Sequence, residues 1–356
     1  MGWCGILSPM PTFRSDNNAG LLPEALAAFT AAARADHASA YGDDPDTARA
    51  IAAFRTLFGP ATEAFFVATG TAANTLAIAS LTRPWQRVLC HDHAHWVKDE
   101  STAPERITAC RAHPIPCHGP KLTTEEFLRS AKTDRGDVHE PQPGVLTLSN
   151  PTEFGATYTP DELASLCRAA HEAGFRVHVD GARFANAVAF LGCQARELAC
   201  DAGVDALSFG GTKNGLAYGE AVLFFPQGDG AAFRQAVRDF PFHRKSTGHL
   251  LSKHRFVTAP FAASLEGGAW LRHASHANAM AKRLLDGLSS LGYSPRFPVE
   301  SNAVFVSLPD PVVARLRAAG HDFYEFGDPA WKLYRLMTSF DTRPADVDAL
   351  LAGVRG

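Results

Sequence analysis

One lysine stands among glycines and small polar residues, in the stretch Ser208 to Gly215. The apolar run 205–209 just before it is typical of a buried strand, and the glycines allow a ligand to approach the backbone closely. Burial lowers the pKa of a lysine, and this frees its amine as a nucleophile that can form a Schiff base. Lys213 is therefore the first candidate catalytic residue; a loop lysine on a tight turn is the alternative.

A carboxylate follows a second strand candidate, the run Phe175 to Val179, which ends in Asp180. In an open α/β sheet the ligand lies at the carboxyl ends of the strands, so Asp180 and Lys213 can meet at one edge. Pyridoxal phosphate uses such a pair: a lysine holds its aldehyde, and a carboxylate keeps its ring nitrogen protonated. The two motifs together predict this cofactor.

A glycine and small hydroxyl groups follow the strand candidate 65–68 and precede an apolar helical stretch. This order aims backbone N–H groups at a phosphate, although the Walker pattern is absent. We expect Gly70, Thr71 and Asn74 to form the phosphate site. The alternative for Thr71 is a helix N-cap.

Three histidines, His91, His93 and His95, alternate after the strand candidate 87–90. At strand spacing their side chains would face the same way, which suits a metal ion. A metal-dependent hydrolase built on these histidines and Asp180 is therefore one function that the residues leave open.

The sequence resembles the low-specificity L-threonine aldolases from about Ser15 to about Thr342. The stretches that carry the resemblance are His178 to Arg183, Phe209 to Gly215, Ser15 to Asn17, Tyr41 to Asp44, Gly70 to Asn74, and His95 with Asp99 and Glu100. Those enzymes use pyridoxal phosphate on the aspartate-aminotransferase-like fold type I. The resemblance implies the same fold and cofactor, and no metal.

The resemblance also implies roles for single residues. His95 would stack on the cofactor ring, His139 would lie near the substrate β-hydroxyl, and Ser15 would approach the substrate carboxylate. A histidine suits proton transfer near neutral pH. Lys245 and Lys253, in the basic segment 242–255, would reach the phosphate of a partner subunit. The alternatives are a loop histidine for His139, a capping turn for Ser15 and a solvated loop for Lys245 and Lys253.

Two arginines point to an amino-acid substrate. A guanidinium binds a carboxylate through paired hydrogen bonds that a lysine cannot match. Arg183 follows Asp180 by three positions and Arg335 lies on a late strand candidate. The resemblance assigns both to the substrate carboxylate; a structural salt bridge is the alternative for Arg183. The expected reaction is retro-aldol cleavage of L-threonine, L-allo-threonine or phenylserine-type substrates to glycine and an aldehyde. A β-eliminating lyase or an aminotransferase on the same fold is the alternative.

The elements that must position these residues alternate between strands and helices. Strand candidates cover 65–68, 87–90, 106–110, 145–148, 175–179, 205–209 and 220–225. A capping box over 159–162 starts the helix before strand 175–179, which implies a parallel crossover. The connection before the last strand is too short for a helix, so that strand should pair antiparallel. We expect an α/β fold with a mostly parallel seven-stranded sheet in a large domain (26–257), an N-terminal segment (1–25) and a smaller α+β C-terminal domain (258–356).

Composition limits the partners. The 356 residues carry a net charge of −3, which argues against a nucleic-acid surface. Seven cysteines without CxxC spacing suggest a reducing compartment. Neither a signal peptide nor an apolar run long enough to span a membrane is evident. We therefore expect a soluble cytoplasmic enzyme with a small amino-acid substrate, assembled as a homodimer or homotetramer.

Overall fold

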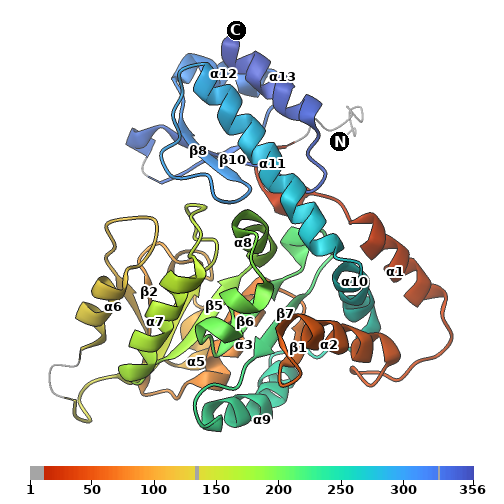
Figure 1. Ribbon diagram of the computed structural model, residues 1–356, viewed down its shortest axis with the longest axis vertical. Helices are drawn as coiled ribbons and strands as arrows, with labels where there is room; N and C mark the ends of the chain where they lie inside the picture. The colour runs from red at the N-terminus through yellow and green to blue at the C-terminus, as the bar shows by residue number, and fades with distance from the viewer. Residues whose placement is uncertain (1–11, 133–135, 328) are drawn as a thin grey trace, which may run out of the picture.

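The structure is a computed structural model that describes residues 12–132, 136–327 and 329–356, so residues 1–11 of the expected N-terminal segment lie outside it. Two sheets organise the described chain (Figure 1). A seven-stranded sheet with its helices forms the larger part, and a three-stranded sheet with the C-terminal helices forms the smaller one. The α/β fold expected from the sequence is confirmed. The exact division at residues 257 and 258 stays a prediction.

The large sheet has the strand order β1-β7-β6-β5-β4-β2-β3. Its strands are β1 (Glu63–Val67), β2 (Gln86–His91), β3 (Arg111–Ile115), β4 (Gln142–Ser149), β5 (Arg176–Gly181), β6 (Ala206–Gly210) and β7 (Glu220–Phe224). Strand β7 runs antiparallel to both of its neighbours, β1 and β6, as its short connection from β6 predicts. The expectation of six parallel strands and one antiparallel strand is confirmed.

The strand expected at 106–110 is wrong. Residues Ala103–Thr108 form helix α5, and the strand β3 begins only at Arg111. Pro104 lies in the first turn of that helix, where proline is well tolerated, and Ala109 ends the helix in the left-handed conformation. The periodicity of this short segment did not separate a helix from a strand.

Helices cover both faces of the large sheet. One face packs against α3 (Gly70–Leu81) and α9 (Ala231–Ser246), through alanines of α3 and the buried Phe240. The opposite face packs against α2 (Pro45–Phe58), α7 (Pro160–Glu172), α8 (Phe184–Leu191) and α10 (Arg255–Glu266). The central strands are buried along most of their length, which explains their apolar runs in the sequence, whereas the edge strand β3 is partly exposed.

The remaining large-part elements are short or peripheral. They are α1 (Pro23–Arg34), α4 (His95–Lys98), α6 (Thr124–Ala131) and the 3-10 turns η1 (Asp16–Asn18), η2 (Ala195–Leu198), η3 (Cys200–Ala202) and η4 (Thr212–Asn214). The lysine motif therefore lies on η4, directly after β6, and η1 brings the beginning of the described chain next to it.

The smaller part is an antiparallel sheet in the order β8-β10-β9, with strands Ala303–Ser307, Leu333–Met337 and Tyr324–Glu325 respectively. It carries the turn η5 (Pro329–Trp331) and packs on α12 (Asp310–Ala318), α13 (Pro344–Arg355) and the long α11 (Ala269–Ser290). Figure 1 shows α11 running from this part down to α10. Phe13 is buried in the same core, so the chain start is part of the smaller unit's packing. Among the described residues, no helix has the length and apolar character that crossing a membrane requires.

Candidate active site

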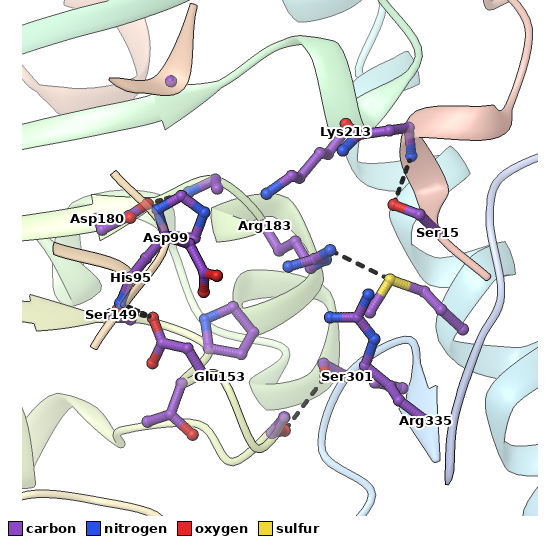
Figure 2. Close-up of a pocket in the computed structure, with 18 of the residues that line it drawn as sticks. Ser15, His95, Asp99, Ser149, Glu153, Asp180, Arg183, Lys213, Ser301 and Arg335 are labelled. Carbon is purple, nitrogen blue, oxygen red and sulfur yellow. Dashed lines mark hydrogen bonds between the residues drawn. The ribbon is translucent and has the colours of Figure 1, made fainter. Parts of the chain in front are cut away.

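A cavity of about 490 Å³ lies between the carboxyl edge of the large sheet and the small sheet (Figure 2). Its lining comes from the start of α3, from the loops after β4, β5 and β6, from η1 and from the small sheet. Eight of the predicted site residues line it: Ser15, Gly70, Asn74, His95, Asp180, Arg183, Lys213 and, from β10, Arg335.

Asp180 and Lys213 meet because β5 and β6 are parallel neighbours, with Asp180 paired to Ser208. The turn after each strand needs glycine. A Cβ on Gly210 would collide with the backbone of Ala182, and a Cβ on Gly211 would collide with the carbonyl of Gly219. The glycines around the lysine thus allow the two strand ends to approach each other closely.

Asp180 is held as a carboxylate. Its oxygens accept hydrogen bonds from Asn74 Nδ2 at 2.8 Å and from the Ala182 N–H at 3.0 Å. Burial raises the pKa of Asp180, but the charges of His95 and Lys213 outweigh burial and leave this pKa below its ordinary value. A carboxylate that stays ionised is what a protonated ring nitrogen requires as its partner.

His95 is fixed from behind by Glu100. Its Nδ1 lies 2.9 Å from Glu100 Oε1, and the same oxygen accepts a hydrogen bond from Asn74 Nδ2 at 3.1 Å. Burial lowers the pKa of His95, but Glu100 and Asp180 raise it above its ordinary value overall. Glu100 is buried, and its role was not predicted from the sequence, although it belongs to a motif that carries the resemblance.

Lys213 reaches the cavity from η4. Burial lowers its pKa below the ordinary value for lysine, and the positive charge of Arg183 lowers it further. Asp16, Asp180 and Glu220 act in the opposite direction without reversing the shift. The amine is therefore easier to deprotonate than a surface lysine, as a nucleophile needs to be.

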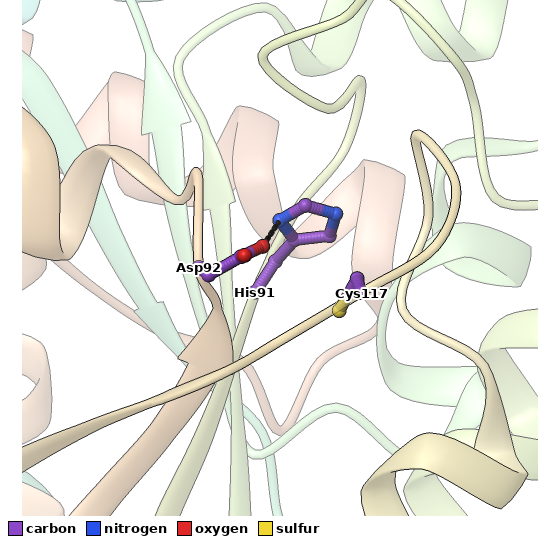
Figure 3. A group of neighbouring side chains, drawn as sticks. All are labelled: His91, Asp92 and Cys117. Atoms are coloured by element: carbon purple, nitrogen blue, oxygen red, sulfur yellow. Dashed lines mark ion pairs between the residues drawn. The ribbon is translucent and has the colours of Figure 1, made fainter.

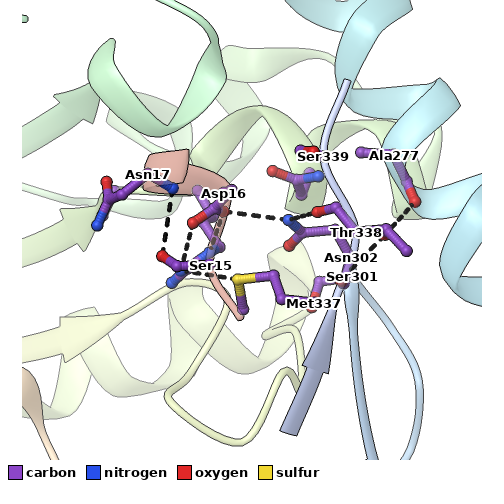
Figure 4. A network of polar contacts seen from close by, with 12 residues as sticks. Ser15, Asp16, Asn17, Ala277, Ser301, Asn302, Met337, Thr338 and Ser339 are labelled. Atoms are coloured by element: carbon purple, nitrogen blue, oxygen red, sulfur yellow. Dashed lines mark hydrogen bonds and ion pairs between the residues drawn. The ribbon is translucent and has the colours of Figure 1, made fainter. Parts of the chain in front are cut away.

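Arg183 is paired with Asp16, a buried residue of η1 that Figure 4 shows linked to Asn302. Its Nε and Nη2 donate to the two carboxylate oxygens of Asp16 at 2.6 and 2.8 Å. Asn302 also donates to Asp16, at 3.1 Å, and so links the chain start to the small sheet. The structural salt bridge that the sequence left open for Arg183 is thus present, while the side chain still lines the cavity. Asp16 itself was missed as a site residue.

Arg335 differs from Arg183 because no carboxylate pairs with it among the described residues. Its Nε is buried without a hydrogen-bond partner, and its Nη2 reaches only the carbonyl of Arg14, at 3.3 Å. The guanidinium lies over the ring of Tyr324, with 5.2 Å from Cζ to the ring centroid. Burial lowers the pKa of Arg335 to about 10, and Arg183 contributes to the shift. An anion in the cavity would complete its coordination.

Ser15 caps η1 by accepting a hydrogen bond from the Asn17 N–H at 3.2 Å, and it also lines the cavity. Thr71 is not among the residues that line the cavity, and its place in the phosphate site stays a prediction. Its alternative as a helix N-cap is wrong, because Thr69, two residues earlier, is the N-cap and accepts from the Ala72 N–H at 3.2 Å. Gly70 is the residue of this turn that lines the cavity.

His139 lies away from the cavity, and its expected place at the substrate β-hydroxyl is wrong. It precedes β4, whose eight residues at about 3.3 Å each separate it from the carboxyl edge by roughly 25 Å. There it is exposed beside Trp85 and Pro141. A residue that comes before a strand lies at the opposite edge from one that follows it, and His139 comes before β4.

Lys245 and Lys253 do not line the cavity of their own chain. Lys245 ends α9 with its amine 5.3 Å from the ring centroid of the exposed Tyr41. Their assignment to a partner's phosphate is untested by this single chain.

The three histidines do not form one site. His91 and His93 pack around Phe154, at ring centroid distances of 5.8 and 5.0 Å, while His95 faces the cavity. Figure 3 shows His91 beside Asp92 and Cys117, whose ligand atoms lie within 4.8 Å of one another. However, His91 Nδ1 already lies 2.9 Å from the His93 N–H and Nε2 lies 3.0 Å from the Gly119 carbonyl, so both ring nitrogens are engaged. The metal-dependent hydrolase is not supported.

Glu153 is a cavity residue that the sequence analysis missed. Its Oε1 accepts hydrogen bonds from Ser149 Oγ at 2.7 Å and from the His95 N–H at 2.8 Å. It follows β4 in the loop at the carboxyl edge, so the rule that identified Asp180 after β5 would also have identified Glu153.

The cavity residues fit pyridoxal phosphate. Asp180 and Lys213 offer the carboxylate and the amine, and His95 lies between Glu100 and the cavity. Gly70 has open space where a Cβ would stand, at the N-terminus of the twelve-residue helix α3, where a phosphate is favoured. The buried Asn74 Oδ1 has no hydrogen-bond partner within the described chain.

Comparisons with known proteins agree with this geometry. Residues 12–310 match the family model described as beta-eliminating lyase. The chain is 44% identical to a low specificity L-threonine aldolase of a Pseudomonas strain, over 96% of both chains, and 43% identical to that of Pseudomonas aeruginosa over the same shares. A threonine aldolase structure from Leishmania major superposes with a TM-score of 0.87 at 24% identity, over 97% of this chain and 99% of the other. An aspartate aminotransferase from Thermus thermophilus gives 0.68 at 17% identity, over 98% and 91%. The last two show the shared fold.

Proposed function

The chain belongs to the beta-eliminating lyase family and is a relative of the low-specificity L-threonine aldolases, and on that premise we propose that it cleaves L-threonine and related β-hydroxy-α-amino acids to glycine and an aldehyde. The related substrates are L-allo-threonine and phenylserine-type amino acids. The observation that carries the proposal is the meeting of Lys213, Asp180 and two arginines at the carboxyl edge of the sheet.

Pyridoxal phosphate, when bound, supplies the electron sink that accepts the electron pair of the broken bond. Lys213 would hold the cofactor aldehyde, and its lowered pKa favours the free amine that a Schiff base needs. Asp180, which Asn74 holds in place, would keep the ring nitrogen protonated. His95, which Glu100 positions, would stack on the ring.

The substrate carboxylate binds at the arginines. Arg335 offers a buried, unpaired Nε, and Arg183 offers the side of its guanidinium that Asp16 does not occupy. A carboxylate held by two planar groups fixes the orientation of the substrate, and this decides which bond at Cα is aligned for cleavage. Ser15 is a third polar group at this end of the cavity.

Product analysis tests the reaction class. Glycine with acetaldehyde from L-threonine, or with benzaldehyde from L-phenylserine, is the expected result. Keto acid and ammonia as main products would instead indicate β-elimination, which expels the β-substituent after Cα–H cleavage, and would contradict the proposal while leaving the cofactor residues unaffected.

The proposal includes a homodimer or homotetramer in the cytoplasm. Its support is the basic end of α9 and the loop after it. Lys245 and Lys253 lie there outside the cavity of their own chain, and the nearby Phe242 is exposed. Two-fold dimers are the commonest assembly, and the described cysteines are all free, as expected in a reducing compartment. Light scattering of the active species tests the assembly; an active monomer would contradict it.

A further inference from the structure

Five acidic side chains line the cavity; two of them are bridged by Asn74, and two others are exposed to solvent. Asp180 and Glu100 are bridged by Asn74 and support the cofactor residues. Asp99 and Glu325 are exposed. The fifth, Glu153, has no assigned task in the reaction as derived so far.

The carboxyl group of Glu153 is held by one oxygen only. Ser149 Oγ and the His95 N–H both donate to Oε1, whereas none of the described residues donates to Oε2 (Figure 2). The loop that carries Glu153 is itself closed by backbone hydrogen bonds between Thr152 and Ala156 and between Gly155 and Thr152, each 2.8 Å long. Oε1 is therefore fixed by two donors, while no other described residue donates to Oε2 of this cavity-lining side chain.

We propose that Glu153 is the catalytic base that takes the proton of the substrate β-hydroxyl during Cα–Cβ cleavage, with Ser149 as its positioning residue. This assignment rests on the proposed function. It fills the role for which the sequence suggested His139, which lies at the opposite edge of the sheet.

Glu153 Oε2 accepts the hydroxyl proton, and the O–H electron pair becomes the second C–O bond of the aldehyde. The electron pair of the Cα–Cβ bond passes to the cofactor. After the aldehyde leaves, Glu153 gives its proton to solvent, Cα takes up one proton, and glycine is released. No oxidant or other reactant is needed.

His95 is less suited to this step than Glu153. Its Nδ1 is engaged with Glu100, and its pKa is raised overall, so the imidazole tends to carry a proton already. Burial raises the pKa of Glu153 above its ordinary value; Ser149 lowers it and Asp180 raises it again. A carboxyl group whose pKa is shifted toward neutrality is a better base than an ordinary glutamate.

The titratable groups around Glu153 come from several elements. They are Cys90 of β2, the backbone-linked His95 of α4, Tyr158 before α7, Asp180 of β5 and Arg183 before α8. Burial raises the pKa values of Cys90 and Tyr158, so these two stay neutral near pH 7. His95 and Glu153 both have raised pKa values, and the variant Ser149→Ala, which removes a hydrogen bond to Glu153 and none to the His95 ring, distinguishes the two in the acidic limb of kcat/KM.

The first test is Glu153→Gln in the cofactor-loaded enzyme. Glutamine keeps an oxygen that accepts from Ser149 and His95 but is not a base. We expect turnover of L-threonine and L-phenylserine to fall about 10²–10⁴-fold. Glycine has no β-hydroxyl, so its dissociation constant, measured from the change in cofactor absorbance, should stay within about twofold. Glu172→Gln, at the exposed end of α7, is the matched control with unchanged turnover.

The second test is Ser149→Ala. Removing the hydroxyl takes away a hydrogen bond that lowers the pKa of Glu153, so the acidic limb of kcat/KM should move to higher pH. A limb that does not move, or turnover of Glu153→Gln within threefold of the parent, overturns the assignment of Glu153. If the parent enzyme itself forms keto acid and ammonia, the proposed function fails instead, and this inference fails with it.

Discussion

The two walls of the cavity treat their charged groups differently. On the wall that the large sheet provides, Asp180 and Arg183 each have at least two hydrogen bonds to other residues of the chain. On the wall that the small sheet provides, Arg335 keeps a buried Nε for which the described residues offer no hydrogen-bond partner. Paired groups can be buried at small cost, whereas an unpaired buried donor is costly unless a ligand completes it. The first wall is therefore preorganised, and the second one is left to the substrate.

Removing the amine of Lys213, on the wall that the large sheet provides, should have the largest effect on turnover. We expect Lys213→Ala to lose turnover by about 10⁴-fold or more, since it removes the nucleophile itself. Borohydride reduction followed by peptide mapping should place the cofactor on Lys213 in the parent enzyme, and Lys98→Ala, an exposed lysine of α4, should retain this label. A label on any other lysine would contradict the assignment.

Breaking the pair on the large-sheet wall should cost stability. Asp16→Ala leaves Arg183 as an uncompensated buried charge, so we expect the free energy of unfolding to fall by about 3–5 kcal/mol. Urea denaturation measures this loss. Asp16→Asn keeps the size of the side chain and removes only its charge, so it separates the two contributions. A loss below about 1 kcal/mol for Asp16→Ala would show that the two walls do not differ in the way described.

Changing the guanidinium of the small-sheet wall should affect binding and not folding. Lysine cannot offer two parallel donors, so Arg335→Lys should raise KM for L-threonine by about 10–100-fold, which corresponds to about 1.4–2.8 kcal/mol. Its urea midpoint should stay close to that of the parent, because no carboxylate of the described chain loses a partner. Arg343→Lys, whose side chain is exposed on α13's N-cap, is the matched control. An unchanged KM would remove Arg335 from the substrate site.

The comparison also explains what the sequence could predict. The parallel order of the large sheet follows from strand spacing and connection length, and the residues after β5 and β6 follow from the rule that sites lie at carboxyl edges. Asp16 and Glu100 were not predicted as site residues because their partners, Arg183 and Asn74, are distant in sequence and only the fold brings them together. His139 shows the opposite error, since a suitable residue type was assigned without asking at which end of β4 it lies.

The smallest effect is expected from removing the negative charge of Glu100, which contacts His95 Nδ1. Glu100→Gln keeps an oxygen that can accept from Asn74 and His95 but removes the negative charge. Burial would still lower the pKa of His95, and Asp180 would oppose it without the charge of Glu100. The pKa of the imidazole, followed by NMR, should therefore fall.

The sign for stability follows from the same shift. A histidine whose pKa is raised on folding contributes stability that is complete below the unfolded pKa of about 6.5 and is lost as the pH rises through the folded value. Between pH 6 and 8 the parent should therefore lose stability relative to Glu100→Gln, whose curve should be flatter there. Urea midpoints at several pH values measure the difference. Parallel curves would mean that Glu100 orients His95 through its hydrogen bond alone. The negative charge of Glu100 would then not raise the pKa of His95.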